Sequence, residues 1–342
     1  MVENLSDMLG FYLSGEHDTL PFSEVKSILE TYGLPYEEEI RVKQLLLIRT
    51  DERAIDIVSR RSAYTKEIFS VEGIGKTISD VENLKIRLSK SFRVRCIRIG
   101  GSMRDLSCSD VERKLGRILL SQNPNLRVDL NNPEEEVLVF LSDMVVVGKS
   151  LKKVDRSLLK IREVSARPFK HPSSMGPVLA RAMVNLSRVK EGDLMLDPFL
   201  GAGGIALEAL MMGIRVIGIE IDERTAKGAQ ENMFSYGFSE EDFKIICGDS
   251  RLVKLDEELD SIVTDPPYGR GSSLRGERLE DLLRDVLENI LSCLKRGGHL
   301  VISLPHWLDA RDIMRDYNLT LIEEHRMRIN RGLSRNIIVL RR

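Results

Sequence analysis

The carboxyl-terminal half of the chain alternates short apolar runs with segments of helical periodicity. A helix is predicted to begin near Ser174, where apolar residues recur at helical spacing as far as Leu186. Strands are predicted at 194–197, 216–220, 243–247, 261–264, 299–303, 319–327 and 336–340. The first five alternate with helices, as in a parallel doubly wound sheet, whereas the last two follow each other directly and predict an antiparallel hairpin.

The amino-terminal half mixes strand and helix patterns less regularly. Strands are predicted at 11–13, 45–48, 92–99, 127–129, 137–140 and 144–148, and helices at 22–32, 54–62, 78–89 and 109–120. Ser109 and Glu112 make a capping box that would open the last of these helices. The pattern predicts an α/β protein with a small α+β module at 1–70, a second module at 71–155, a basic linker at 156–172 and a doubly wound domain at 173–342.

Length and composition limit the class of protein. With 342 residues, of which 42% are hydrophobic, the chain is long enough for two or three domains. No apolar run approaches the roughly 18 residues of a membrane span, and the amino terminus is acidic where a signal peptide would be basic, so we expect a cytoplasmic location. Four cysteines and five histidines are scattered without paired spacing, which predicts neither a disulfide framework nor a metal site.

Charge is unevenly distributed although the net charge is only −2. Residues 1–40 carry nine acidic side chains and one base, whereas residues 85–104 carry seven bases and no acid. A local excess of this kind predicts a face that binds a phosphate backbone, with an ordinary solvated surface as the alternative. Residues 149–170 are also rich in basic side chains. This segment would connect two domains, or its bases would continue the phosphate-binding face.

A glycine-rich loop follows the first strand of the doubly wound domain. It contains Asp197, Gly201 and Gly203, and an apolar helix comes after it. Glycines at this place let the backbone approach a ligand at the carboxyl ends of the strands. Together with Ala206 they also match the dinucleotide pattern G-x-G-x-x-A, so a nicotinamide- or flavin-dependent oxidoreductase stays open at this point.

Two further carboxylates follow the next two strands. Glu220 ends the second strand, where a carboxylate accepts hydrogen bonds from ribose hydroxyls, and its neighbour Ile221 belongs to the same predicted site. Asp249 follows the third strand and would accept a hydrogen bond from an adenine amine, while Ser250 would cap the next segment. A plain cap explains Asp249 almost as well. The pattern favours a cofactor that contains adenosine.

The fourth strand ends in Asp265-Pro266-Pro267-Tyr268-Gly269, which discriminates between these interpretations. The exocyclic amine of a base is a poor nucleophile because its lone pair is delocalised into the ring. Hydrogen bonds to the Asp265 carboxylate and the Pro266 carbonyl would favour a pyramidal nitrogen, poised for in-line attack on a sulfonium methyl group. Asp265 would take the proton, and Tyr268 would stack on the base. A hydride-transferring enzyme has no need of this carboxylate, whereas an amine-methylating enzyme does.

With these motifs in order, residues 171–342 resemble the class I methyltransferases that use S-adenosylmethionine to modify amino groups of nucleobases. Segments 171–175 and 179–186, and the Asp265 motif continued by Arg270, are similar to those of the archaeal and eukaryotic tRNA guanine-10 N2-methyltransferase family. Residues 91–101, with the capping box at Ser109, are similar to the THUMP domain of these enzymes, which a ferredoxin-like module precedes.

The resemblance implies a Rossmann-like domain with a seven-stranded, mostly parallel sheet whose last strand is antiparallel, and S-adenosylmethionine as the cofactor. It also implies individual roles. Asp197, Gly201 and Gly203 would surround the methionine part of the cofactor, under a lid at 171–175 that includes Ser174. Glu220 would hold the ribose, and Asp249 would meet the adenine.

The family pattern implies that Asp265, Pro266 and Tyr268 bind the target guanine, with Asp265 as the catalytic carboxylate. One departure is Gly176, where a bulkier residue is expected before Pro177.

The THUMP domain is expected to grip the acceptor end of tRNA. The candidate side chains would position phosphates without reading sequence, and they are Lys85, Arg87, Arg93, Arg95, Arg98, Arg104, Arg113 and Lys114. Some members of the family form a heterodimer with a small zinc-binding activator subunit, and others act alone.

The predicted function is transfer of a methyl group from S-adenosylmethionine to N2 of guanine 10 in tRNA, giving N2-methylguanine or N2,N2-dimethylguanine. One alternative is methylation of another guanine in tRNA or ribosomal RNA, or of an adenine or cytosine amine in DNA. The other is an RNA-binding module with a decayed catalytic domain. Loss of Asp265 or of the glycine loop would favour that second alternative, yet both are present.

Overall fold

The structure is a computed structural model that describes residues 5, 7–171, 174–268, 278–309, 311, 317–330 and 333–342. Pro172, Ser173, Gly269 and Arg270, which belong to the motifs above, lie outside the described residues. The chain divides into two compact units. The first comprises Met1–Phe22, Gly33–Arg60 and Tyr64–Asp155, and the second comprises Ser23–Tyr32, Arg61–Ala63 and Arg156–Arg342.

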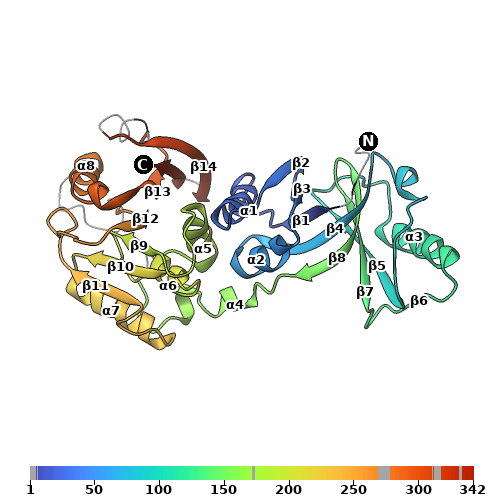
Figure 1. The fold of residues 1–342 in the computed structure, drawn as a ribbon, viewed down its shortest axis with the longest axis horizontal. Coiled ribbons are helices and arrows are strands. Elements are labelled where there is room, and N and C mark those ends of the chain that lie inside the picture. Colours follow the sequence, from blue (N-terminus) through green and yellow to red (C-terminus); the bar gives the residue numbers. More distant parts are fainter. Residues whose placement is uncertain are drawn as a thin grey trace. The chain divides into compact units, whose positions relative to one another are not determined.

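An eight-stranded sheet forms the first unit, in the order β2-β3-β1-β4-β8-β7-β5-β6 (Figure 1). Its strands are β1 (Met8–Leu13), β2 (Tyr36–Val42), β3 (Leu45–Thr50), β4 (Thr65–Gly75), β5 (Ser91–Arg98), β6 (Arg127–Val128), β7 (Glu135–Leu141) and β8 (Val145–Lys153). Strand β4 crosses residue 70 and pairs with β1 on one side and β8 on the other. One continuous sheet therefore runs through both amino-terminal segments.

Helix α3 (Cys108–Gln122) packs its apolar face on β5, whose alternation is confirmed: Phe92 and Val94 are buried in the shared core. The predicted helix at 78–89 is wrong, because only Ile78–Val81 forms a short 3-10 helix. Beyond it Leu84, Ile86 and Leu88 pack against the same core. An apolar side chain at every second residue suits an extended chain and not a helix.

The start of α3 also differs from the prediction. Ser107, not Ser109, caps the helix by accepting a hydrogen bond from the Asp110 N–H, while Glu112 accepts one from the Cys96 N–H of β5 at 2.8 Å. The predicted capping box is therefore wrong, because the strand N–H takes the carboxylate that would complete it.

Two cysteines that are distant in the sequence lie close together in the structure. Cys96 and Cys108, twelve positions apart, place their Sγ atoms 3.0 Å from each other. Burial, together with the hydrogen bond to Cys108, raises the pKa of the Cys96 thiol. Both cysteines are free thiols in the structure.

A seven-stranded sheet forms the core of the second unit, in the order β11-β10-β9-β12-β13-β15-β14. Its strands are β9 (Leu194–Asp197), β10 (Arg215–Glu220), β11 (Phe243–Cys247), β12 (Leu259–Thr264), β13 (Leu294–Pro305), β14 (Thr320–Asn330) and β15 (Leu333–Arg341). Strand β15 is antiparallel to both of its neighbours, and the other strands run one way. This confirms the predicted parallel sheet with an antiparallel strand and places the carboxyl ends of β9 to β13 at one edge.

The helices that follow β8 are α4 (Ser157–Lys160), α5 (Pro177–Leu186), α6 (Gly204–Leu210), α7 (Glu223–Ser235) and α8 (Leu279–Ile290). Helices α6, α7 and α8 connect β9 to β10, β10 to β11 and β12 to β13, whereas α4 and α5 precede β9 (Figure 1). Residues 248–258, between β11 and β12, form no helix, so the predicted alternation of the first five strands with helices is wrong at that step. Pro177 occupies the first turn of α5, as predicted, where its missing N–H leaves no hydrogen bond unmade. Among the residues described, no helix combines the length and the apolar character of a membrane span.

Two bases of the predicted linker are buried and do not form part of an anion-binding face. The Arg162 Nε lies 2.6 Å from Oε1 of Glu208, a carboxylate with no exposed surface, and Arg181 donates to Oε2 at 3.2 Å. Arg167 is 1% exposed and donates to the carbonyls of Arg162 and Met175. These guanidinium groups compensate a buried carboxylate and hold the chain that leads into α5.

Parts of α1 (Leu20–Thr31) and α2 (Arg53–Arg61) belong to the second unit through buried polar contacts. Arg61 donates from Nε to Asn185 Oδ1 at 3.1 Å and from Nη2 to the Val189 carbonyl at 2.7 Å. Asn185 in turn donates to Glu24 Oε1 at 2.8 Å. Because each of these groups is buried with a partner, the two short segments are fixed against α5.

Candidate active site

The loop between β9 and α6 holds the predicted glycines in conformations that favour glycine. Gly201 has a φ of +54° and Gly203 a φ of +78°, both in the left-handed region. A Cβ at Gly201 would meet no atom within 4 Å, so open space adjoins the backbone there. A Cβ at Gly204 would lie only 2.9 Å from the Met175 carbonyl oxygen. The structure thus brings the segment before α5 against the start of α6.

Glu220 joins this loop to the end of β10. Its Oε2 accepts a hydrogen bond from the Gly201 N–H at 2.9 Å, and its Oε1 accepts one from the Asp222 N–H at 2.9 Å. Each oxygen keeps a further lone pair for a ligand hydroxyl. The next side chain, Ile221, is 45% exposed and presents apolar surface at the same edge.

Asp197 ends β9 and is 1% exposed. Its Oδ1 accepts hydrogen bonds from Thr264 Oγ1 at 2.8 Å and from the Phe199 N–H at 3.2 Å. Burial raises the pKa of Asp197 to about 7; the two hydrogen bonds oppose this shift, and the charges of Asp265 and Glu220 add to it. A cation bound beside Asp197 would favour its ionised form.

The loop after β11 uses its predicted residues differently from expectation. The Asp249 carboxylate accepts from the Arg251 N–H at 3.0 Å and from its Nη2 at 2.6 Å. An adenine amine would therefore share this carboxylate with a guanidinium. The Ser250 hydroxyl does not cap the next segment; it donates to the Pro198 carbonyl and ties this loop to the loop after β9. Contact of either residue with a cofactor stays a prediction.

Ser174 precedes α5 in the predicted lid. Its N–H donates to the His171 carbonyl at 3.0 Å, and its buried Oγ has no hydrogen-bond partner among the described residues. Gly176 has a φ of −71°, and a Cβ there would meet only Glu163 Oε2, at 3.8 Å. The backbone therefore has room for the bulkier side chain that the family pattern leads one to expect.

Asp265 follows β12, and its two oxygens have different partners. Oδ1 accepts a hydrogen bond from the Tyr268 hydroxyl, and Oδ2 lies 3.0 Å from Arg335 Nη1. The Tyr268 hydroxyl is also 2.5 Å from Ser303 Oγ, near the end of β13. Burial, and next the negative charge of Asp265, raises the pKa of Tyr268, so its hydroxyl stays protonated and donates. Pro266, directly after the carboxylate, is buried.

The face of Tyr268 expected to stack on a base is only partly available in this state, because the ring packs against the apolar core of the second unit. Its role in base binding stays a prediction.

Three polar residues of the site were missed from the sequence. Arg335 and Ser303 contact the Asp265 cluster, and Asn232 of α7 donates from Nδ2 to the carbonyls of Phe169 and Ala202, each at 3.0 Å. Arg335 carried a usable signal, since it directly precedes a strand predicted to be antiparallel, whose start must lie at the carboxyl edge of the others. The sequence offers no signal of this kind for Asn232.

The predicted RNA-binding side chains do not form one group of free cations. Arg93 Nη2 and Arg95 Nε pair with Glu136 at 2.6 and 3.1 Å, and Arg95 also pairs with Glu67. Arg98 donates to backbone carbonyls of the turn that follows β5. These three side chains have structural partners, so their contact with RNA stays a prediction.

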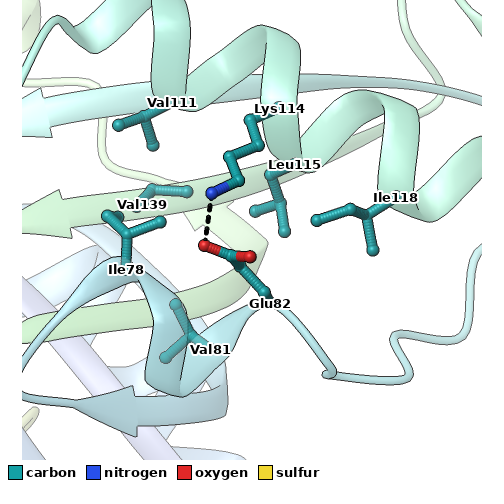
Figure 2. Close-up of a pocket in the computed structure, with 8 residues that line it drawn as sticks. All are labelled: Ile78, Val81, Glu82, Val111, Lys114, Leu115, Ile118 and Val139. Atoms are coloured by element: carbon teal, nitrogen blue, oxygen red, sulfur yellow. Dashed lines mark hydrogen bonds and ion pairs between the residues drawn. The ribbon is translucent and has the colours of Figure 1, made fainter.

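The two predicted bases of α3 also have acidic partners. Arg113 pairs with Asp110 at 2.5 Å, and Lys114 pairs with Glu82 at 2.6 Å across the mouth of a small apolar pocket (Figure 2). Lys85 and Arg87 are exposed and form no ion pair among the described residues, and Arg104 donates only to the Gly101 carbonyl, at 3.2 Å. Lys85, Arg87 and Arg104 are therefore the exposed members of the predicted set whose charge no acidic partner compensates in the described structure.

Comparison with known proteins assigns the family. A profile of RMKL-like methyltransferase domains matches residues 165–335, and a THUMP domain profile matches residues 70–147. The chain is 36% identical over 334 residues to the tRNA (guanine(10)-N2)-dimethyltransferase of Methanothermobacter thermautotrophicus, covering 96% of this chain and 98% of that protein. The chain belongs to the tRNA (guanine(10)-N2)-methyltransferase family.

Other members and structures agree with this assignment. The tRNA (guanine(10)-N2)-dimethyltransferase of Methanocaldococcus jannaschii is 32% identical over 366 residues, covering 98% of this chain and 100% of its own. The crystal structure of TrmN from Thermus thermophilus shares the fold, with a TM-score of 0.55, 23% identity, and coverage of 98% and 99% of the two chains. The family and fold predicted from the sequence are confirmed, and the oxidoreductase alternative has no support.

Proposed function

We propose that this chain transfers a methyl group from S-adenosylmethionine to N2 of guanine 10 in tRNA, forming N2-methylguanine or N2,N2-dimethylguanine. The observation that carries the proposal is the Asp265 carboxylate, fixed at the carboxyl edge beside a glycine loop, in a chain that belongs to the tRNA (guanine(10)-N2)-methyltransferase family. An exocyclic amine needs an acceptor of this kind because its lone pair is otherwise delocalised.

The residues that follow the first two strands, β9 and β10, fit S-adenosylmethionine. Gly201 leaves open space beside its backbone, and Glu220 has acceptor capacity where ribose hydroxyls would lie. Asp197 would compensate the positive charge of the methionine part, and Ile221, which is exposed, would offer apolar surface to the adenine. When bound, the cofactor supplies an electrophilic sulfonium methyl group.

Asp265 would act on the guanine. The carboxylate would accept a hydrogen bond from the N2 amine and so orient the nitrogen lone pair away from the ring plane. As the bond from N2 to the methyl carbon forms and the carbon–sulfur bond breaks, N2 acquires a positive charge and loses a proton, which Asp265 can accept. Pro266 and Tyr268 would form the wall against which the base rests.

The amino-terminal unit would hold the RNA. We assign segment 1–70 to the ferredoxin-like module, 71–155 to the THUMP domain and 156–172 to the linker, with 173–342 as the methyltransferase domain. Lys85, Arg87 and Arg104 are the bases in best position for phosphate contacts, because their charges have no acidic partner among the described residues. A tRNA substrate also underlies the expected cytoplasmic location.

Methyl transfer from labelled S-adenosylmethionine to two unmodified tRNA transcripts tests the proposal. One transcript carries guanine at position 10 and the other adenine, and the product nucleoside is identified by mass. Label as N2-methylguanine in the first transcript alone is the expected result. Equal labelling of both transcripts would show that the methylated nucleotide is not guanine 10. Activity of the purified chain alone would show that no zinc-binding activator subunit is needed.

A further inference from the structure

Arg335 reaches the candidate catalytic carboxylate from a distant part of the chain. It lies near the start of β15, opposite Pro305 of β13 and Met327 of β14. Because β15 runs against its neighbours, its start lies at the edge where β12 and β13 end. There Arg335 Nη1 is 3.0 Å from Asp265 Oδ2, and each of the two side chains is 17% exposed.

Not every donor of the Arg335 guanidinium has a partner among the described residues. Its Nε is buried and has no hydrogen-bond partner among the described residues. Its Cζ lies 5.9 Å from the centre of the Tyr268 ring. An unpaired buried donor costs roughly 1–3 kcal/mol, so an arrangement chosen for stability alone would pair it.

The two oxygens of Asp265 have partners of different kinds. The Arg335 guanidinium, at Oδ2, bears a permanent positive charge on a planar group, which fixes the plane of the carboxylate. The Tyr268 hydroxyl, at Oδ1, is a neutral donor that an amine N–H can replace without loss of a hydrogen bond.

We propose that Arg335 is the positioning residue of Asp265: it fixes Oδ2 so that Oδ1 faces the amine of the target base, which takes the place of the Tyr268 hydroxyl. This inference rests on the function proposed above. The antiparallel strand thereby acquires a role in the reaction, since a parallel strand would place its start at the opposite edge.

Replacement of Arg335 tests the proposal. Arg335→Met removes both the charge and the donors, and Arg335→Gln keeps a donor without the charge. We expect kcat to fall about 100-fold in Arg335→Met, because a misplaced acceptor loses the near-attack geometry, while the Kd for S-adenosylmethionine stays within about threefold. Arg335→Lys restores the charge, and we expect it to recover part of the loss.

Arg341→Met is the matched control, since Arg341 is an exposed arginine at the other end of β15. A kcat for Arg335→Met equal to that of Arg341→Met would overturn the proposal. So would loss of cofactor binding together with kcat in both Arg335→Met and Arg335→Gln, because Arg335 would then be structural. The unaltered chain separates this failure from failure of the proposed function: if it methylates no guanine 10, the function is wrong; if it does, only the role of Arg335 is in question.

Discussion

The carboxyl edge of the second sheet contains two half-sites that are built differently. The cofactor half comprises the loops after β9, β10 and β11, and there Glu220 is held by the N–H groups of Gly201 and Asp222. The base half comprises the ends of β12 and β13 with the start of β15, and there Asp265 is held by the side chains of Tyr268 and Arg335.

The difference lies in what a substitution can remove. Backbone donors remain when side chains change, so the geometry of the cofactor half depends mainly on the loop conformations around Gly201 and Gly203. The base half depends on individual side chains, one of them 70 positions away from Asp265. We therefore expect the base half to lose turnover through single substitutions, and the cofactor half to lose affinity.

The largest effect is expected from Asp265→Ala. Removal of the acceptor should lower kcat by about 10²- to 10⁴-fold, since it takes away both orientation and proton acceptance. Equilibrium binding of labelled S-adenosylmethionine should stay close to normal, because no described residue of the cofactor half forms a hydrogen bond with this carboxylate. An equal loss of cofactor affinity would contradict the separation of the two half-sites.

Glu220→Ala should give the opposite signature. Hydrogen bonds to a charged group contribute about 1.5–3 kcal/mol, so we expect cofactor affinity to fall by about 10- to 100-fold. At saturating cofactor, kcat should recover to within a few-fold. Glu223→Ala is the control, since Glu223 is an exposed carboxylate three positions on that pairs only with Lys227 in the described structure. A kcat that stays low at saturating cofactor would show that Glu220 also acts in the base half, and would contradict the separation of the two half-sites.

From Asp197 we expect a smaller effect, a dependence of stability and of cofactor affinity on pH. Burial raises its pKa to about 7, so the folded protein without cofactor holds a proton there that the unfolded chain loses near its ordinary value of 3.8. Stability from this group is therefore lost as pH rises from about 4 to about 7. Cofactor affinity should change in the other direction, rising up to about tenfold from about pH 6 to about pH 7.5, because the cationic cofactor favours the ionised carboxylate.

Thermal unfolding and cofactor binding of Asp197→Asn, measured over the same pH range, check both trends. In this variant we expect stability and cofactor affinity to depend less on pH. If both depend on pH as in the unaltered chain, another group is responsible for the titration.

The smallest effect is expected on tRNA binding by the first unit, where bases with acidic partners can be compared with bases without them. Replacing Lys85 and Arg87 together by Ala should lower the slope of log affinity for tRNA against log salt by about 1.4–2, as for two lost phosphate contacts. Replacing Arg93 and Arg95 should weaken tRNA binding less, because Glu136 and Glu67 already compensate them. A larger effect of the second pair would show that these ion pairs open on RNA.

The sequence predicted the cofactor half better than the base half for a physical reason. Strand ends such as Asp197 and Glu220 are set by local apolar runs, and helices between successive strands predict parallel strands whose carboxyl ends share one edge. Contacts between side chains of distant segments, such as that of Arg335 with Asp265, depend on strand order and register, which a local pattern does not give.

The same limit explains the errors in the first unit. Leu84, Ile86 and Leu88 pack into the core from an extended chain. The residues around them are common in helices, so the sequence pattern of 78–89 wrongly predicted a helix. The acids that compensate Arg93 and Arg95 lie on β4 and β7, 28 and 43 positions away from them, so a charge count along the chain overstates the free charge of this face.

The order of the strands also has a consequence in time. A ribosome that adds about 5–20 residues per second needs roughly 4–14 seconds to pass from Asp265 to Arg335. During that interval the growing chain already contains every residue of the cofactor half but lacks the arginine that fixes the acceptor. On our proposal, the emerging protein acquires the residues that bind a methyl donor before it acquires the means to orient a base.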